Sequence, residues 1–184
     1  GVLRLEGVGM NPTRTGLIEI LRSMGARIEV ANPRLSGGEP IADLDVHPSA
    51  LHGVSVPREL VPLAIDEFPV LFVAAACAAG DTLVTGAEEL RVKETDRIAV
   101  MAAGLRALGA TVETLADGMR ISGGALSGGT IDCGGDHRIA MAFAVASLRA
   151  TGPIRILDTA NVATSFPGFV TLARRAGLAL EEQD

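Results

Sequence analysis

The sequence predicts an α/β fold in which sheets lie outside a core of helices. Residues 68–79, 98–108 and 139–148 are helical in length and almost free of polar side chains, and a helix that is apolar all round is buried. The pattern Leu-Arg-x-x-Gly-Ala occurs at 21–26 and again at 105–110, each time where a helix should give way to a strand. We therefore expect the apolar helices to pack against one another, with short strands around them.

The N-terminal third is expected to combine strands with one helix. Alternating apolar residues indicate the strands, and Asn11 or Thr13 can cap a helix that Gly25 ends. In order, the expected elements are a strand at 2–5, that helix, a strand at 27–30, a Gly/Pro turn region at 33–40, a strand at 42–47 and a short strand at 54–56.

The rest of the chain holds the apolar helices. The regular part of the helix at 62–79 should begin near Phe68, because Pro69 is tolerated in a first turn. Asp117-Gly118 is a strong hairpin signal. The other expected elements are strand 82–85, helix 93–108, hairpin strands 111–114 and 119–121, strand 130–133, helix 136–148, strand 154–157, a helix from 165–167 to 176 and strand 178–180.

These elements repeat as a β-α-β-α-β-β unit. Residues 53–122 hold a full copy, 129–182 a copy without its last strand, and 1–47 a copy without its first strand and helix. Incomplete copies leave sheet edges and apolar faces uncovered. We therefore expect residues 1–184 to form a single domain that is a piece of a longer protein.

Composition excludes several function classes. The chain is acidic, with a net charge of −6 and no Trp or Tyr, so it lacks the basic, aromatic surface of nucleic-acid binders. Cys77 and Cys133 match no metal or redox spacing, and a reduced, cytoplasmic setting is the default. The longest apolar run, 68–80, is shorter than the roughly 20 residues that span a bilayer. We expect neither nucleic acid nor membrane as a partner.

Basic residues stand where two buried helices begin. Arg91, Lys93 and Arg97 precede the helix pattern at 98–108, and Lys93 and Arg97 share a face if that helix begins by Lys93. Arg138 occupies the first turn of the next apolar helix. Each cation at a helix N-terminus is unfavourable by about 0.3–1 kcal/mol. The pattern predicts one anionic ligand, bound by both helix starts.

The same segments carry a family resemblance. Arg-Val-Lys-Glu-Thr-Asp-Arg at 91–97 and Asp-His-Arg-Ile-Ala-Met at 136–141 resemble the signature segments of the EPSP synthase (3-phosphoshikimate 1-carboxyvinyltransferase) family. Shorter segments at 11–16, 65–69 and 163–167 agree in the family's order. The resemblance implies an inside-out α/β barrel of three β-α-β-α-β-β units. It also implies that the chain is the C-terminal domain of a two-domain enzyme, with the N-terminal domain as its partner.

The resemblance also implies a reaction and the residues that perform it. The enolpyruvyl group of phosphoenolpyruvate is transferred to the 5-hydroxyl of shikimate 3-phosphate, and phosphate leaves, without metal or cofactor. Arg97 and Arg138 would bind phosphoenolpyruvate through paired hydrogen bonds, and Lys93 would help to neutralise the ligands. Glu94 would exchange the proton at the methylene carbon. Asp66 would bind the sugar acid and act as base for its hydroxyl.

Each of these residues also has a purely structural interpretation. Arg97 and Arg138 could each form a surface ion pair, with Asp96 or Asp136. Lys93 could simply be solvated, and Glu94 could be a carboxylate that is favourable near a helix N-terminus. Asp66 could be an N-cap. Arg14 is a weaker site candidate, for which a structural ion pair is the preferred interpretation.

The sequence departs from the family pattern at Thr164. Many members carry a lysine there that contacts phosphoenolpyruvate, whereas Thr164 brings no charge. Together with Glu-Glu-Leu before Arg91, this resembles a divergent bacterial branch of the family. Ser165, without a partner histidine nearby, is expected to be an N-cap.

Two other functions compete with this one. UDP-N-acetylglucosamine 1-carboxyvinyltransferase has the same fold and donor, but the Lys-Glu-Thr-Asp-Arg and Asp-His-Arg segments argue against it. A non-catalytic module that only binds an anion is the alternative from another class.

Overall fold

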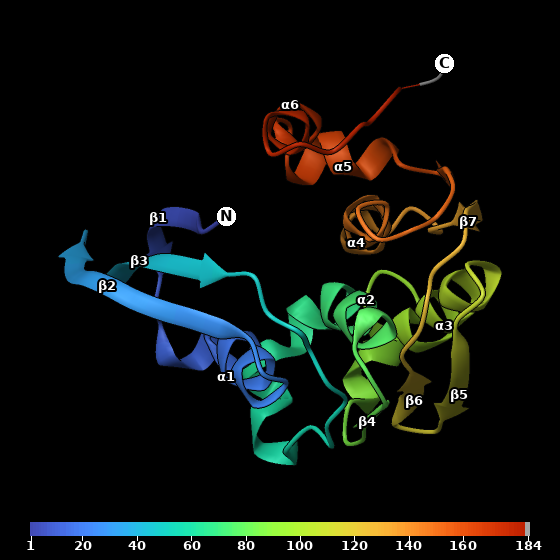
Figure 1. The fold of residues 1–184 in the computed structure, drawn as a ribbon, viewed down its shortest axis with the longest axis horizontal. Coiled ribbons are helices and arrows are strands. Elements are labelled where there is room, and N and C mark those ends of the chain that lie inside the picture. The colour runs from blue at the N-terminus through green and yellow to red at the C-terminus, as the bar shows by residue number, and fades with distance from the viewer. Residues whose placement is uncertain (183–184) are drawn as a thin grey trace.

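The computed structural model describes residues 1–182, and in it three sheets surround a centre of helices (Figure 1). Helices α2 (Phe68–Cys77), α3 (Arg97–Ala107) and α4 (His137–Ala146) pack against one another. This arrangement confirms the helix core that the apolar segments predicted. None of the helices within the described residues is long and apolar enough to cross a bilayer.

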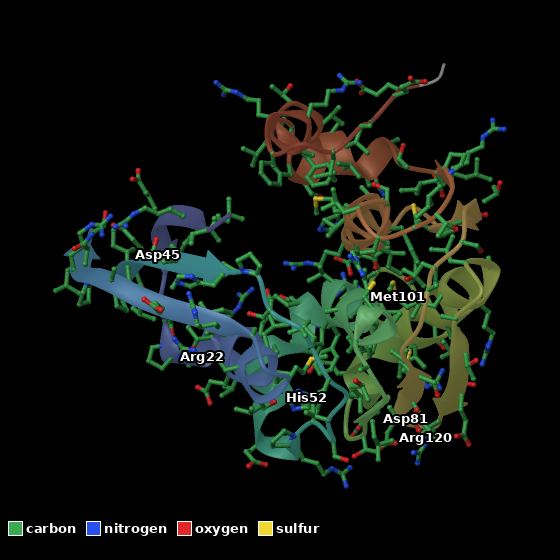
Figure 2. All side chains as sticks on the ribbon, in the orientation of Figure 1. Arg22, Asp45, His52, Asp81, Met101 and Arg120 are labelled. Carbon is green, nitrogen blue, oxygen red and sulfur yellow. The ribbon has the colours of Figure 1, made fainter. Side chains whose placement is uncertain are left out.

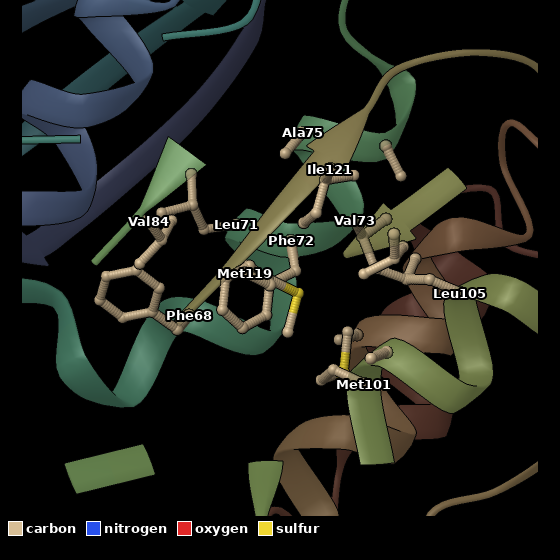
Figure 3. Packing of buried hydrophobic residues seen from close by; sticks show 14 of the residues in the cluster. Phe68, Leu71, Phe72, Val73, Ala75, Val84, Met101, Leu105, Met119 and Ile121 are labelled. Atoms are coloured by element: carbon tan, nitrogen blue, oxygen red, sulfur yellow. The ribbon is translucent and has the colours of Figure 1, made fainter. Parts of the chain in front are cut away.

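The core forms where α2 and α3 meet the second sheet (Figure 3). Phe68 and Phe72 of α2 and Met101 of α3 are fully buried there. A Cβ on Gly104 would lie 2.4 Å from Cζ of Phe143, so α3 and α4 approach closely at this glycine. Figure 2 shows the contrast: Met101 lies among the helices, whereas Asp81 and Arg120 lie on the outer surface.

The first sheet holds β1 (Leu3–Gly9), β2 (Arg27–Ser36) and β3 (Glu39–His47) in the order β1-β3-β2. Helix α1 (Gly16–Ser23) lies between β1 and β2 in the chain. The turn region predicted at 33–40 is wrong in extent, because the two strands continue to a tight turn at Gly37 and Gly38. A shift of register between Ala31 and Arg34 accommodates Pro33 without ending β2.

The second sheet holds β4 (Asp81–Val84), β5 (Thr111–Leu115) and β6 (Gly118–Ser122) in the order β4-β6-β5. The predicted hairpin is confirmed. The short strand predicted at 54–56 is wrong: Ser55 makes only an isolated bridge to Leu83.

Helix α3 begins later than predicted. Residues Glu88–Val92 form a 3-10 helix, and Lys93 is extended. Asp96 is the N-cap, and its carboxylate accepts a hydrogen bond from Ala99 N. An N-cap has a non-helical backbone, so α3 cannot include Lys93. Lys93 and Arg97 therefore share no helix face.

The C-terminal segment also departs from the prediction. Strands β7 (Gly129–Asp132) and β8 (Ile154–Leu157) pair in parallel, and α5 (Ala160–Ser165) and α6 (Phe169–Arg175) follow. The helix expected from 165–167 to 176 is confirmed as α6, although it begins only at Phe169, and α5 was not predicted. The two helices are separated at Pro167, because proline disfavours the helical conformation in the residue that precedes it. Ser165 therefore ends α5 instead of capping a helix, and the strand predicted at 178–180 is absent from the described residues.

Candidate functional site

Four basic side chains from four segments surround the Asp66 carboxylate. Asp66 lies near the end of a 3-10 helix (Pro62–Glu67) that leads into α2. Its oxygens lie 3.4 Å from Arg14 Nη2, 3.5 Å from Lys93 Nζ, 3.8 Å from Arg97 Nη1 and 3.8 Å from Arg138 Nη2. Charge-assisted hydrogen bonds are about 2.7–2.9 Å long. The cations are therefore grouped around Asp66 without making close bonds to it.

Arg97 is the most deeply buried of these cations. Its side chain is 1% exposed, Nε donates to Asp136 Oδ2 at 2.8 Å, and Nη2 donates to Glu94 Oε2 at 2.6 Å. A surface ion pair was the structural alternative, but the pair with Asp136 is buried. The third nitrogen, Nη1, is buried and has no hydrogen-bond partner within residues 1–182. An unpaired buried donor of this kind is rare in folded proteins, and the Asp66 carboxylate, 3.8 Å from Nη1, lies beyond hydrogen-bond distance.

Asp136 connects the starts of α3 and α4. It is fully buried and is the N-cap of α4, where Oδ1 accepts from Arg138 N at 2.9 Å and from Ile139 N at 3.4 Å. Burial raises the pKa of this carboxyl, but hydrogen bonds from Arg97 and from the two backbone amides outweigh it, so the pKa lies below its ordinary value. Asp136 is therefore an anion at neutral pH.

Arg138 is much more accessible than Arg97. Its side chain is 32% exposed, and Nη1 donates to the backbone carbonyl of Asp66 at 3.0 Å. Together with Asp66 and Glu67 it lines a hollow of about 140 Å³ whose other walls are apolar. The Arg138 head group therefore borders open space between α2 and α4.

Lys93 and Glu94 complete the cluster. Lys93 Nζ donates to Glu89 Oε1 at 2.5 Å, and this bond, with a smaller effect from Asp66, raises the pKa of Lys93 despite some burial. Glu94 is half exposed, and Oε2 is held by Arg97. Asp66 is not the N-cap that its structural alternative required, because Glu67 occupies that position of α2 and makes no side-chain cap.

The structure separates two sequence candidates from this cluster. Thr164 is exposed on α5, and no hydrogen bond or ion pair joins it to the other candidates within the described part of the chain. Arg91 turns the other way: it donates to Leu115 O, Ala116 O and Asp96 Oδ2 at 2.6–2.7 Å. Of the three cations that the charge pattern grouped at the start of α3, Arg91 is therefore structural.

The structure adds one carboxylate that sequence reasoning missed. Glu67 lies 3.6 Å from Arg14 and 3.7 Å from Arg138, and its Oε2 is buried without a partner within residues 1–182. Its signals in the sequence were its place next to Asp66 and its inclusion in the segment at 65–69 that resembles the family. Arg14 forms ion pairs with both carboxylates, as its structural interpretation predicted, although it also borders the cluster.

Comparisons with known proteins identify the family to which the chain is similar. The family model for EPSP synthase (3-phosphoshikimate 1-carboxyvinyltransferase) matches residues 1–172. A 3-phosphoshikimate 1-carboxyvinyltransferase from Acidithiobacillus ferrooxidans is 68% identical over 97% of this chain, and one from Alkalilimnicola ehrlichii is 65% identical over 99%. The chain spans 41% of the length of each relative.

Solved structures show the same fold. EPSP synthase from Acinetobacter baumannii superposes with a TM-score of 0.96 at 54% identity, covering 99% of this chain and 43% of the other. The enolpyruvyl transferase NikO from Streptomyces tendae, at 18% identity and a TM-score of 0.66 over 96% of this chain and 38% of NikO, shares the fold. The inside-out α/β architecture is thus confirmed, and the chain belongs to the EPSP synthase family.

Proposed function

We propose that this chain carries half of the active site of a 3-phosphoshikimate 1-carboxyvinyltransferase. The enzyme would transfer the enolpyruvyl group of phosphoenolpyruvate to the 5-hydroxyl of shikimate 3-phosphate and release phosphate. The observation that carries the proposal is the buried, unpaired Nη1 of Arg97 within the group of cations around Asp66. In the free protein these cations lie 3.4–3.8 Å from the Asp66 carboxylate. A bound anion among them would instead make short charge-assisted hydrogen bonds.

The residues divide into anion binding and proton transfer. Arg97 and Arg138 begin neighbouring helices, and each has a nitrogen 3.8 Å from the Asp66 carboxylate, so one small dianion can reach both. Lys93 adds a third charge on the same side of Asp66 as Arg97. Glu94 and Asp66 are carboxylates that lie beside these cations, and they are the groups proposed to carry protons for the methylene carbon and the 5-hydroxyl. Thr164 would add at most a neutral contact.

We infer that the working enzyme needs an N-terminal half. Leu3, Leu5 and Val30 of the first sheet, together with Val2 just before β1, expose 40–57% of their surface, and such apolar faces are normally covered. The division into units 1–47, 53–122 and 129–182 accounts for this, because the first unit lacks the first strand and the first helix of the repeat and retains α1 as its only α-helix. The isolated chain should then be inactive, since shikimate 3-phosphate would lack much of its site. A cytoplasmic location is part of this inference, and the free thiols Cys77 and Cys133 support it.

The test is phosphate release from phosphoenolpyruvate, measured with and without shikimate 3-phosphate. The chain is assayed alone and after mixing with the N-terminal half of the Acidithiobacillus ferrooxidans relative. We expect release only in the mixture and only with shikimate 3-phosphate. Release with UDP-N-acetylglucosamine instead would establish the rival transferase. No release in any mixture that forms a complex would favour the non-catalytic module.

A further inference from the structure

One carboxylate restrains both arginines of the candidate site. Asp136 Oδ2 accepts from Arg97 Nε at 2.8 Å, and Oδ1 accepts from the backbone nitrogen of Arg138 at 2.9 Å. Arg97 and Asp136 are 1% and 0% exposed. Because Nε is bonded to Asp136 and Nη2 to Glu94, the guanidinium plane is fixed, and the unpaired Nη1 is the nitrogen that remains for a ligand.

We propose that Asp136 is a positioning residue for phosphoenolpyruvate. It directs Arg97 Nη1 towards the site and fixes the first turn of α4, which carries Arg138, so that two cations on different helices meet one dianion. This inference rests on the proposed function. Asp136 itself does not touch the substrate, because both oxygens are buried and occupied by the protein. Because pre-organised donors of this kind already have the orientation that the ligand needs, no binding energy is lost in reorienting them.

The chain contains a matched control. Asp96 caps α3 as Asp136 caps α4, accepting from Ala99 N at 3.0 Å, and its other oxygen accepts from Arg91 Nη1 at 2.7 Å. Both aspartates thus combine a helix cap with an arginine. Arg91, however, donates its remaining nitrogens to backbone carbonyls of the β5–β6 turn. Loss of the ion pair between Asp96 and Arg91 should therefore not change the geometry of the candidate site.

The substitutions Asp136→Asn and Asp96→Asn separate capping from positioning. Asparagine caps helices as well as aspartate does, so the amide oxygen retains the backbone bonds in both variants. The amide nitrogen then faces a guanidinium donor, so Arg97 Nε loses its acceptor in one variant and Arg91 Nη1 in the other. Of the Arg97–Asp136 pair, only the longer 3.4 Å bond from Nη2 to the retained oxygen remains. Asp136→Ser is a second variant, because serine also caps a helix but is too short to hold Arg97. Urea denaturation verifies that each variant is folded.

The readout is the KM for each substrate in the mixture of this chain with the N-terminal half. We expect Asp136→Asn and Asp136→Ser to raise the KM for phosphoenolpyruvate about 10- to 100-fold, as small misplacements in a binding site do. The KM for shikimate 3-phosphate should change less than about 3-fold. Asp96→Asn should leave both values within about 2-fold, since its arginine lies outside the site. Equal phosphoenolpyruvate KM values in folded Asp136 and Asp96 variants would overturn the proposal.

A second measurement does not depend on turnover. Titration of ¹⁵N-labelled chain, alone and in the complex, with phosphoenolpyruvate follows the Nε–H signals of its arginines. Asp136→Asn should remove the protected Arg97 signal and weaken the response to phosphoenolpyruvate at least about 10-fold. If the unsubstituted mixture releases no phosphate, the proposed function fails while this titration still decides the role of Asp136. The positioning role of Asp136 would be overturned if Asp136→Asn bound phosphoenolpyruvate as well as the unsubstituted protein does, or if the unsubstituted protein did not bind it.

Discussion

Arg97 and Arg138 occupy equivalent places in the sequence but different environments in the structure. Each lies in the first turn of an apolar helix that an aspartate caps. Arg97 is 1% exposed and bonded to two carboxylates, whereas Arg138 is 32% exposed and donates to one backbone carbonyl. Arg97 is thus largely committed to the fold, with one nitrogen left over, and Arg138 is largely available to a ligand. Two arginines at equivalent positions of a motif can therefore differ in how much each contributes to the stability of the fold and to ligand binding.

The largest expected effect is on stability. Arg97→Ala would leave Asp136 buried without its partner charge, and breaking a buried pair in this way costs about 3–5 kcal/mol. Urea denaturation of the chain should show that loss. Arg138→Ala should cost no more than about 1 kcal/mol, because its ion pairs are long and partly exposed. Equal losses in the two variants would remove the distinction between them.

Arg138→Ala should instead act on function. Removal of one charge-stabilising donor from an active site lowers the rate about 10²- to 10³-fold, and we expect kcat/KM for phosphoenolpyruvate to fall within that range in the mixture with the N-terminal half. Arg138→Lys keeps the charge but not the paired geometry, so it should recover only part of the loss. Full activity in folded Arg138→Ala would show that this arginine is not a ligand.

Acid should distinguish loss of the Asp136 carboxylate from loss of the Arg138 guanidinium. The pKa of Asp136 is lower in the folded chain than its ordinary value of about 3.9, so the unfolded chain takes up the proton first. Its contribution to stability is complete above about pH 5 and is lost as the pH falls through the folded pKa. Denaturation measured from pH 7 to pH 3 should therefore give a shallower decline in Asp136→Asn than in Arg138→Ala.

That acid comparison has an internal reference. Asp43 of β3 accepts hydrogen bonds from Asn32, Gly7 N and Arg34, which hold the pKa of its carboxyl well below the ordinary value. Both variants retain Asp43, so both should still lose some stability in acid. Identical slopes in the two variants would mean that Asp136 does not contribute.

The smallest expected effect belongs to Arg91. Arg91→Ala removes hydrogen bonds to the β5–β6 turn and to Asp96, at about 1 kcal/mol of stability. Its guanidinium is bonded away from the candidate site, so kcat/KM for phosphoenolpyruvate should stay within about 2-fold. A larger loss of kcat/KM would show that Arg91 does act on the ligand.

Sequence reasoning identified the helix core and the segments that form the site, because runs of apolar residues and clusters of charge are local signals. The charge pattern alone could not assign roles to the cations, and only the family resemblance proposed them. Whether Arg91 or Arg97 faces the site depends on where α3 begins, and the Asp96 cap decides that. The partner of Arg97 is Asp136, 39 positions away in the chain. The sequence offered Asp96 and Asp136 only as partners in a surface ion pair, and no local pattern reports that the pair with Asp136 is buried. Likewise, Thr164 could be aligned with a family position, but α5 was not foreseen.

The most direct test of the central claim is a crystal structure of the chain, joined with the N-terminal half, in the presence of phosphoenolpyruvate and shikimate 3-phosphate. We predict that oxygens of the bound phosphoenolpyruvate, or of its reaction product phosphate, lie about 3 Å from both Arg97 Nη1 and Arg138 Nη2. Asp136 should retain its bonds to Arg97 and to the first turn of α4. A ligand bound elsewhere, with Arg97 Nη1 still unpaired, would contradict the account.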